Sequence, residues 1–267
     1  MSARLKSVLA TLRHRGVHVC PCSSRSYGFM PRSVRSLKAN DYFICANGAL
    51  ALRRRDERAL VEHTLDREAI ASIMERLSSF FLAWNVLLYD GMWFEPLGTF
   101  FFYHGEPMPR RIARYVRRAI FPDEGTHPVL SVVRLLAEWN EPVYQLECVC
   151  RSREERDRVF TILAQRNDIS ASRMEDVVIQ ISPRGTSKGS TARELQRLLG
   201  VTREQTVAFG DGLNDLPLAQ ASGTFVAMGN ADPELKRQAT EVTGTVDEDG
   251  MAAWLERLLK EDEALHG

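Results

Sequence analysis

The chain has 267 residues, of which 44% are hydrophobic, and its 35 Lys and Arg residues balance 35 Asp and Glu residues. That length and apolar content are enough for one large or two smaller folded domains. A formal net charge of 0 excludes a general electrostatic attraction to nucleic acid or to an anionic membrane, so we expect neither as a partner. The longest apolar run, residues 80–89, is too short to span a bilayer.

The cysteines favour a reducing compartment. There are five, with no CxxC pair and no histidine cluster of zinc-binding spacing. Four of them form two pairs whose members are two residues apart, which places each pair on one face of a strand as small apolar side chains. We therefore expect reduced thiols and a cytoplasmic protein. The five are Cys20, Cys22, Cys45, Cys148 and Cys150.

The first forty residues carry eight basic residues and no acidic one, a composition that a mitochondrial transit peptide can share. Their pattern favours a folded segment instead. Residues 5–12 have helical apolar spacing, Gly16 follows as a helix stop, and residues 17–22 suit a short buried strand. A further apolar run at residues 42–45 and a return arm at residues 49–52 predict a hairpin.

The middle of the chain mixes helices and strands. A helix is predicted over residues 66–77, and an aromatic hairpin follows with arms at 85–89 and 92–95. Strands at 144–150 and 177–181 flank a further helix. We expect the aromatic side chains here to form a core rather than a surface that stacks on substrate. They are Phe80, Phe81, Trp84, Trp93 and Phe94.

A basic helix lies in the same region. Helical spacing gathers four arginines on one side and four apolar residues on another. We expect the arginines to form a solvated outer face, and the alternative is that some of them recognise an anionic substrate. The arginines are Arg110, Arg111, Arg114 and Arg118, and the apolar residues are Ile112, Val116, Ala119 and Ile120.

The last third alternates between helix and strand, which predicts a parallel sheet covered by helices. Helices are expected at residues 192–199 and 216–221, and strands at residues 207–209 and 225–228. A final helix follows Gly250.

The strongest chemical signal is Gly210-Asp211-Gly212-Leu213-Asn214-Asp215, which stands directly after a predicted strand and before a helix. Open α/β sheets bind ligands at the carboxyl ends of their strands. Two carboxylates and an amide in one tight turn, which the glycines permit, supply the oxygen ligands that Mg²⁺ prefers. An Asx-rich turn that caps the next helix is the alternative, and for Asp215 alone it is the better one.

Two weaker signals could serve the same site. Lys188 lies in a loop between a strand and a helix, where its ammonium could hold a phosphoryl group, although a lone lysine is usually solvated. Ser23, Ser24 and Arg25 end the strand predicted at residues 17–22, so a hydroxyl and backbone N–H groups could face the same phosphate.

Together these segments resemble the Cof-type phosphatases of the haloacid dehalogenase superfamily, and the resemblance covers nearly the whole chain. The family usually reads Ala-Thr-Gly-Arg where this chain has Cys22-Ser23-Ser24-Arg25. The string Ile44-Cys45-Ala46-Asn47-Gly48-Ala49 looks like the signature of the third core strand. Lys188 matches the lysine of the third motif, residues 210–215 match the fourth, and Ala227-Met228-Gly229-Asn230-Ala231 resembles the usual tail.

The resemblance implies a Mg²⁺-dependent phosphatase of small phosphate esters, with sugar phosphates as the expected class. Asp211 would bind Mg²⁺, Asp215 would support the metal, and Lys188 would act with both in catalysis. The phosphate and the substrate would be held by Ser23, Ser24, Arg25, Asn47, Gly48, Asn214 and Asn230. The implied fold is α/β, with a doubly wound parallel-sheet core at residues 1–57 and 182–267. An inserted α/β cap at residues 58–181 would select the ester.

One element of the family pattern has no counterpart. The first motif, Asp-x-Asp-Gly-Thr, ends the central strand in the family, and no such string occurs before Ser23. Its two aspartates would be the nucleophile and the general acid/base, so no aspartyl phosphate can form without them. We expect a gap in the sheet where that strand belongs, and we attribute it to a late start of the sequence rather than to an inactive protein.

Two rival functions remain. One is a noncatalytic protein that binds Mg²⁺ and a phosphorylated ligand as a sensor or assembly partner, and the weaker one is a phosphomutase, which needs the same nucleophile. No motif encodes the identity of the ester or the oligomeric state. We expect the site residues to converge on one cleft between core and cap.

Overall fold

The computed structural model describes residues 1–80 and 82–266. They form two compact units. Unit 1 consists of Met1–Cys22, Arg32–Val61 and Ser187–Gly267, and unit 2 consists of Ser23–Pro31 and Glu62–Thr186. The predicted core segment 1–57 therefore includes nine residues, Ser23–Pro31, that pack with unit 2.

Unit 1 contains the helices of both chain ends and two small sheets. Its helices are α1 (Ala3–His14), α2 (Arg32–Arg35), α8 (Lys188–Leu199), α9 (Leu216–Ala221), α10 (Pro233–Gln238) and α11 (Gly250–His266), with the short 3-10 turns η1 (Ala46–Gly48) and η2 (Leu213–Asp215). One sheet has the order β1 (Tyr42–Cys45), β2 (Leu50–Arg53), β3 (Arg58–Glu62), and the other has the order β10 (Val207–Gly210), β11 (Thr224–Ala227), β12 (Glu241–Val242).

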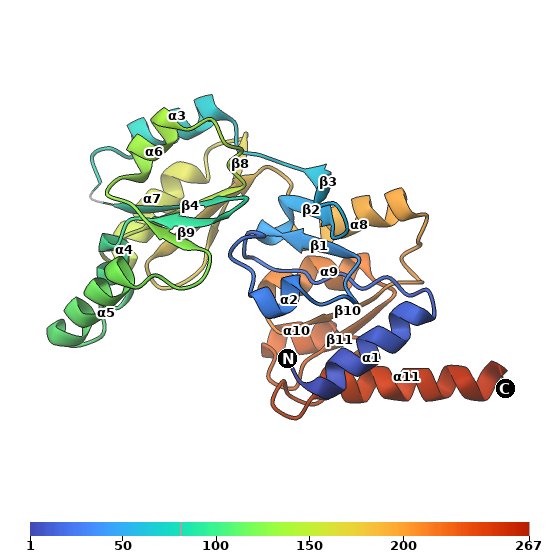
Figure 1. The fold of residues 1–267 in the computed structure, drawn as a ribbon. Helices are drawn as coiled ribbons and strands as arrows, with labels where there is room; N and C mark the ends of the chain where they lie inside the picture. Colours follow the sequence, from blue (N-terminus) through green and yellow to red (C-terminus); the bar gives the residue numbers. More distant parts are fainter. Residues whose placement is uncertain (81, 267) are drawn as a thin grey trace. The chain divides into compact units, whose positions relative to one another are not determined.

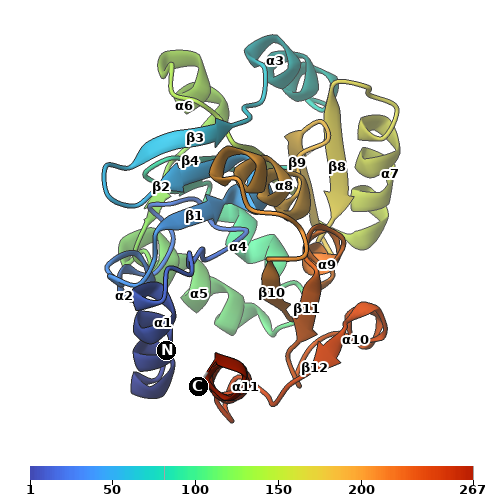
Figure 2. The ribbon, with the colours of Figure 1, turned by 90° about the vertical axis from the view of Figure 1, so that its right-hand side faces the viewer.

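The parallel sheet predicted for this unit is present in part among the described residues, with a break where the central strand was expected to be missing. The β10-β11-β12 sheet is parallel, as Figure 2 shows, but β1 and β2 pair antiparallel in a separate sheet. The predicted strand at residues 17–22 is only a pair of parallel bridges, from Val19 to Asn40 and from Cys22 to Ile44. Since β10 is an edge strand, no described strand joins the two sheets.

Helices cover both faces of the parallel sheet. On β11, Phe225 and Ala227 pack with apolar residues of α9 and α10, whereas Val226 points to the opposite face. There it packs against Val8 of α1 and Trp254 of α11, two helices that lie side by side in Figure 1. The alternation of side chains along a strand therefore buries β11 on both sides, as expected for a parallel strand.

Local signals account for the ends of several helices. Asp232 caps α10 by accepting from the N–H of Glu234, and Pro233 takes the first helical position. Gly200 ends α8 with φ of +68°, a conformation that glycine adopts without strain. In unit 2, Asp66 accepts from the N–H groups of Glu68 and Ala69 and so begins α3.

Unit 2 is built on a six-stranded sheet of order β6-β5-β4-β7-β9-β8. Its strands are β4 (Ala83–Leu88), β5 (Gly91–Phe94), β6 (Thr126–Pro128), β7 (Gln145–Val149), β8 (Ile169–Arg173) and β9 (Val178–Pro183). Its helices are α3 (Arg67–Arg76), α4 (Leu97–Phe102), α5 (Met108–Ile120), α6 (Val132–Glu138) and α7 (Arg153–Leu163).

The two faces of this sheet are covered differently. Apolar residues of α3, α6 and α7 form one large core with Trp84, Val86, Leu146 and Ile179 of the strands. On the other face, Phe101 of α4 packs against a smaller set that includes Ala83 and Val149.

The expected aromatic core of this region is confirmed for the described residues. Trp84 and Phe94 are buried, and Phe80 and Trp93 pack against the large core. Phe81 lies outside the described residues. All five cysteines are free thiols, and Cys148 and Cys150 share that core, as their spacing predicts. Within the described part of the chain, no helix has the length and apolar character needed to cross a membrane.

Candidate active site

The turn after β10 is organised around Asp215. Its Oδ2 accepts hydrogen bonds from the backbone N–H of Asp211 at 3.1 Å and from that of Gly212 at 3.3 Å. Gly210 makes this close approach possible, because a Cβ at that position would lie 2.6 Å from the Cβ of Asp215. The folded turn leaves Asp211 exposed at the carboxyl end of the strand, while Asp215 is buried beneath it.

Lys188 reaches the same turn from the first residue of α8. Its Nζ lies 2.6 Å from Oδ1 of Asp215, and the two side chains are only 7% and 8% exposed. Ser187 caps the helix, with its hydroxyl accepting from the N–H of Ser190. Both oxygens of Asp215 are thus engaged within the protein, so this carboxylate positions Lys188 and the turn and has little capacity left for a metal.

The loop after β1 lies against the start of α8. Gly48 has φ of +102°, and a Cβ there would lie 2.3 Å from the carbonyl oxygen of Ser187. The hydroxyl of Thr191 donates to the carbonyl of Gly48 at 2.5 Å. The preceding Asn47 has φ of +53°, and its Oδ1 accepts from Nδ2 of Asn214 at 3.1 Å. Two predicted residues that are far apart in the chain are therefore in direct contact.

Asn230 extends the cluster to Asp211. Its Oδ1 accepts from the N–H of Val246 at 3.1 Å, which turns the amide nitrogen toward Asp211. The Nδ2 to Oδ2 distance is 3.4 Å, so this contact with Asp211 is weak. In unit 1, then, hydrogen bonds join the predicted residues in three contacting pairs: Lys188 with Asp215, Asn47 with Asn214, and Asp211 with Asn230.

Ser23, Ser24 and Arg25 belong to unit 2, so their convergence on this cluster stays a prediction. Within that segment the Ser23 hydroxyl accepts from the N–H of Arg25 at 3.1 Å, and the guanidinium of Arg25 stacks on the ring of Phe29. The residue before them, Cys22, does belong to unit 1. Burial raises the pKa of its thiol to about 12, with a smaller opposing effect of Lys188, so Cys22 lies near that ammonium.

The metal-binding capacity of unit 1 is limited. No group of three or more His, Cys, Asp or Glu side chains that could hold a metal ion occurs in the described part of the chain. Asp211 offers one exposed carboxylate, and Asn214, whose Nδ2 donates to Asn47, offers an amide oxygen in the same turn, whereas Oδ1 of Asn230 is engaged by the N–H of Val246. Such a set suits Mg²⁺, which commonly takes one or two carboxylates and completes its shell with waters and substrate phosphate.

Sequence reasoning missed two residues that shape this site. The buried hydroxyl of Thr191 holds Gly48, and Nζ of Lys236 donates to the carbonyl of Gly229 at 2.6 Å, beside Asn230. Both residues lie on helices, where the spacing of the apolar residues identifies them only as polar positions. The hydrogen-bond partner of Thr191 is 143 residues away in the chain. No local pattern could have identified them.

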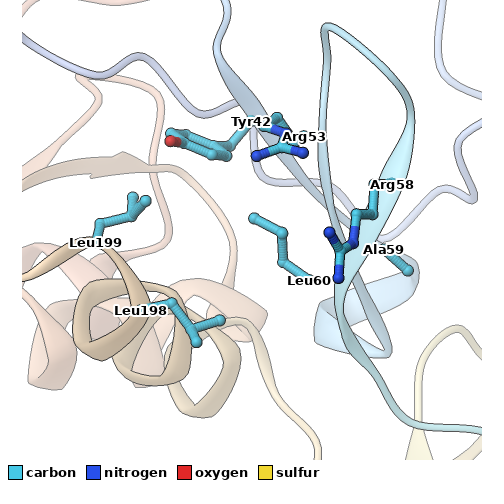
Figure 3. A pocket seen from close by; sticks show the side chains of 7 residues that line it. All are labelled: Tyr42, Arg53, Arg58, Ala59, Leu60, Leu198 and Leu199. Atoms are coloured by element: carbon cyan, nitrogen blue, oxygen red, sulfur yellow. The ribbon is translucent and has the colours of Figure 1, made fainter.

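A separate pocket of about 300 Å³ lies elsewhere in unit 1. Leu60, Leu198 and Leu199 provide its apolar side and Arg53 and Arg58 its polar side, as Figure 3 shows. From β1 the pocket is lined by Tyr42, the first residue of the strand. Asn47 of the candidate site lies beyond the other end of the same strand. The pocket includes none of the predicted site residues.

Parts of the chain are similar to known phosphatases. Phosphatase YwpJ of Bacillus subtilis (strain 168) is 42% identical over 80 residues, which are 30% of this chain and 28% of the relative. The 5-amino-6-(5-phospho-D-ribitylamino)uracil phosphatase YwtE of the same organism is 27% identical over 139 residues, 52% of this chain and 48% of the relative. The matched region spans less than half the length of either relative.

The fold is shared over a larger part of the chain. The crystal structure of a hypothetical protein from Geobacillus kaustophilus HTA426 is 26% identical, with a TM-score of 0.74 over 97% of this chain and 92% of the other. The family model for haloacid dehalogenase-like hydrolases matches residues 1–255. The chain therefore belongs to the haloacid dehalogenase-like hydrolase family.

Proposed function

We propose that the complete protein is a Mg²⁺-dependent phosphatase of small phosphate monoesters, with sugar phosphates as the preferred class. The observation that carries this proposal is the buried pair of Lys188 and Asp215 directly beneath the exposed carboxylate of Asp211. A fixed ammonium beside a metal-binding carboxylate is suited to the negative charge of a phosphoryl group.

Each residue of the cluster has a distinct task in this proposal. Asp211 would hold Mg²⁺, whose charge would offset that of the phosphate oxygens. Lys188, held in place by Asp215, would donate to a phosphate oxygen, and Asn214 and Asn230 would orient water and substrate. Ser23, Ser24 and Arg25 would bind the remaining phosphate oxygens through their hydroxyl, backbone N–H and guanidinium groups.

The nucleophile would come from a strand beside β10. Strand β10 is at the edge of its sheet, and among the described residues Val19 and Cys22 have bridges only to Asn40 and Ile44, on the β1 side. We propose that sequence outside these 267 residues supplies a strand between them, ending in an Asp-x-Asp-Gly-Thr motif.

In the reaction, a carboxylate oxygen of the first aspartate attacks phosphorus as the bond to the ester oxygen breaks. The second aspartate, protonated, gives its proton to the leaving alcohol. Water, deprotonated by that same aspartate, then hydrolyses the aspartyl phosphate and restores both carboxyl groups.

The choice of substrate class has support from one relative. YwtE is named for a substrate that carries phosphate on a ribityl chain, which is a phosphorylated polyol. A phosphorylated sugar presents the same combination of a phosphate monoester and neighbouring hydroxyl groups. We therefore place sugar and sugar-alcohol phosphates first in the panel of substrates.

The test is phosphate release from a panel of phosphate esters by the chain extended to include the missing motif, with and without Mg²⁺. Asp211→Asn should abolish Mg²⁺-dependent release, because it removes the exposed carboxylate. Asp247→Asn is the matched control, since Asp247 is another exposed carboxylate of unit 1 outside the cluster. An extended chain that binds Mg²⁺ and phosphate but releases none from any ester would favour the sensor function.

A further inference from the structure

Helix α5 presents its apolar side to solvent. It contains no buried residue, although its sequence separates arginines and apolar residues cleanly. Six large apolar side chains at or just beyond this helix are exposed, and an apolar patch of this kind normally marks an interaction site. We call them the α5 apolar face: Met108, Ile112, Tyr115, Val116, Ile120 and Phe121.

Arg111 and Arg118, from the side that we expected to be solvated, are instead turned toward the rest of unit 2, whereas Arg110 and Arg114 are exposed. Arg111 donates twice to the carbonyl of Phe100, at 3.0 and 2.8 Å, and stacks on that residue's ring. Arg118 lies over the ring of Phe94 on the sheet, with its Nη1 3.4 Å from the hydroxyl of Thr99. The expectation fails for these two arginines because helical periodicity says which residues share a side of the helix but not which side packs inward.

A third arginine completes this arrangement. Arg114 forms a bidentate pair with Glu106, with both distances 2.9 Å, and stacks on Tyr103. Three arginines along the helix are thus held by separate groups of unit 2. These contacts fix the rotation of α5 about its axis, so the exposure of the apolar side is a stable feature of the fold. In Figure 1, α4 and α5 project together from the sheet of their unit.

The charge of α5 indicates the kind of partner. Residues 108–120 contain five arginines and no acidic residue. Glu106 and Asp123 pair with Arg114 and Arg117, which leaves the helix with a net positive charge. Two copies of this face would bring like charges together, whereas an anionic surface would attract them. A basic amphipathic helix with exposed apolar side chains is typical of helices that lie on membrane surfaces.

The size of the face also argues against a second copy. Thirteen residues make a face about 20 Å long and about 10 Å wide, well short of the roughly 800 Å² that each partner buries in a stable protein interface. Insertion into a lipid headgroup layer needs no such area, because each apolar side chain contributes separately. The zero net charge of the whole chain conceals this local basic segment.

We propose that the α5 apolar face docks peripherally on an anionic lipid bilayer, with the apolar side chains entering the headgroup boundary. The arginines would stay on the aqueous side of the headgroup boundary and attract the anionic headgroups. This inference does not depend on the phosphatase proposal.

The experiment is flotation of the full chain with vesicles of phosphatidylcholine alone and of phosphatidylcholine with phosphatidylglycerol. Binding should require the anionic lipid and weaken as salt rises. Val116→Asn should reduce partitioning about tenfold, because one apolar side chain no longer enters the boundary. Val133→Asn on α6 is the matched control and should bind like the unaltered chain, since Val116 and Val133 are 44% and 45% exposed in the same unit.

Two further measurements keep the outcome decisive. Circular dichroism of both variants checks that the fold is retained, as expected for substitutions at exposed positions. Light scattering without vesicles tests for a dimer, and a dimer that Val116→Asn dissociates would overturn the proposal in favour of a second copy. Equal binding to neutral vesicles, or equal binding by Val116→Asn and the unaltered chain, would also overturn it.

Discussion

The Nζ of Lys188 lies 2.6 Å from Oδ1 of Asp215, and both side chains are almost entirely removed from solvent. The partners lie 27 residues apart in the chain, one at the start of α8 and the other in η2. This pair connects the stability of unit 1 with the geometry of the candidate site.

Removal of one member of the pair should be costly. Lys188→Gln leaves the Asp215 charge buried without a cationic partner, and we expect a loss of about 3–5 kcal/mol in the free energy of unfolding. The double variant Lys188→Gln/Asp215→Asn retains a neutral amide pair and should recover most of it. Urea unfolding of the three chains checks this, and a loss below about 1 kcal/mol for Lys188→Gln would mean that the pair behaves as a surface salt bridge.

Gly48 should tolerate no side chain. Gly48→Ala combines a φ of +102° with a Cβ 2.3 Å from the carbonyl oxygen of Ser187, and we expect it to cost about 3 kcal/mol or more. Gly200→Ala is the matched control, because Gly200 also has positive φ but nothing lies within 4 Å of its added Cβ, so about 1 kcal/mol is expected. Similar melting temperatures for the two variants would contradict the packing of this loop on α8.

Glu147 should make stability depend on pH. Burial raises the pKa of its carboxyl, although Asn85 and Gln145 donate to it. A raised folded-state pKa means that folding is favoured at low pH and that this contribution is lost as pH rises through the folded-state pKa. Glu147→Gln removes the charge, and its remaining carbonyl oxygen can still accept one of these two hydrogen bonds.

The variant should therefore be more stable than the unaltered chain at pH 7, by about 1 kcal/mol, and the difference should disappear below about pH 4. Thermal unfolding measured from pH 3.5 to pH 8 checks both the sign and the window. A gain that is the same at all pH values would show that hydrogen bonding alone, and not ionisation, is responsible.

Adding the missing strand to the N-terminus should affect both stability and phosphate release, and a variant of the added motif distinguishes the two effects. The 267-residue chain should release no phosphate from sugar phosphates, because it lacks the nucleophile. The chain extended through an Asp-x-Asp-Gly-Thr strand should release phosphate when Mg²⁺ is present. Its melting temperature should also be higher, since the added strand pairs with the open edge of β10. Extension with Asn-x-Asn-Gly-Thr is the control, because it should raise the melting temperature equally without restoring turnover. Robust turnover by the unextended chain that Asp211→Ala abolishes would show that another residue supplies the nucleophile.

Elements with strong local signals were predictable from the sequence. The strand at residues 42–45 and the helix at residues 216–221 have the predicted bounds, and Asp232 and Pro233 begin α10 through a local cap. These elements depend on short-range patterns of apolar spacing and capping. The strand predicted at residues 17–22 did not form because a strand needs continuous pairing with a neighbour, and among the described residues this segment makes only two bridges, to Asn40 and to Ile44 of β1.

The sequence by itself determined the chemistry of the turn at residues 210–215, because glycines and Asx side chains act within a few residues of one another. Only the tertiary structure decided that Asp215 is occupied by Lys188 and two N–H groups while Asp211 stays exposed. It also decided that α5 turns Arg111 and Arg118 inward, because which side of an amphipathic helix packs is set by groups outside the helix, here Phe100 and Phe94.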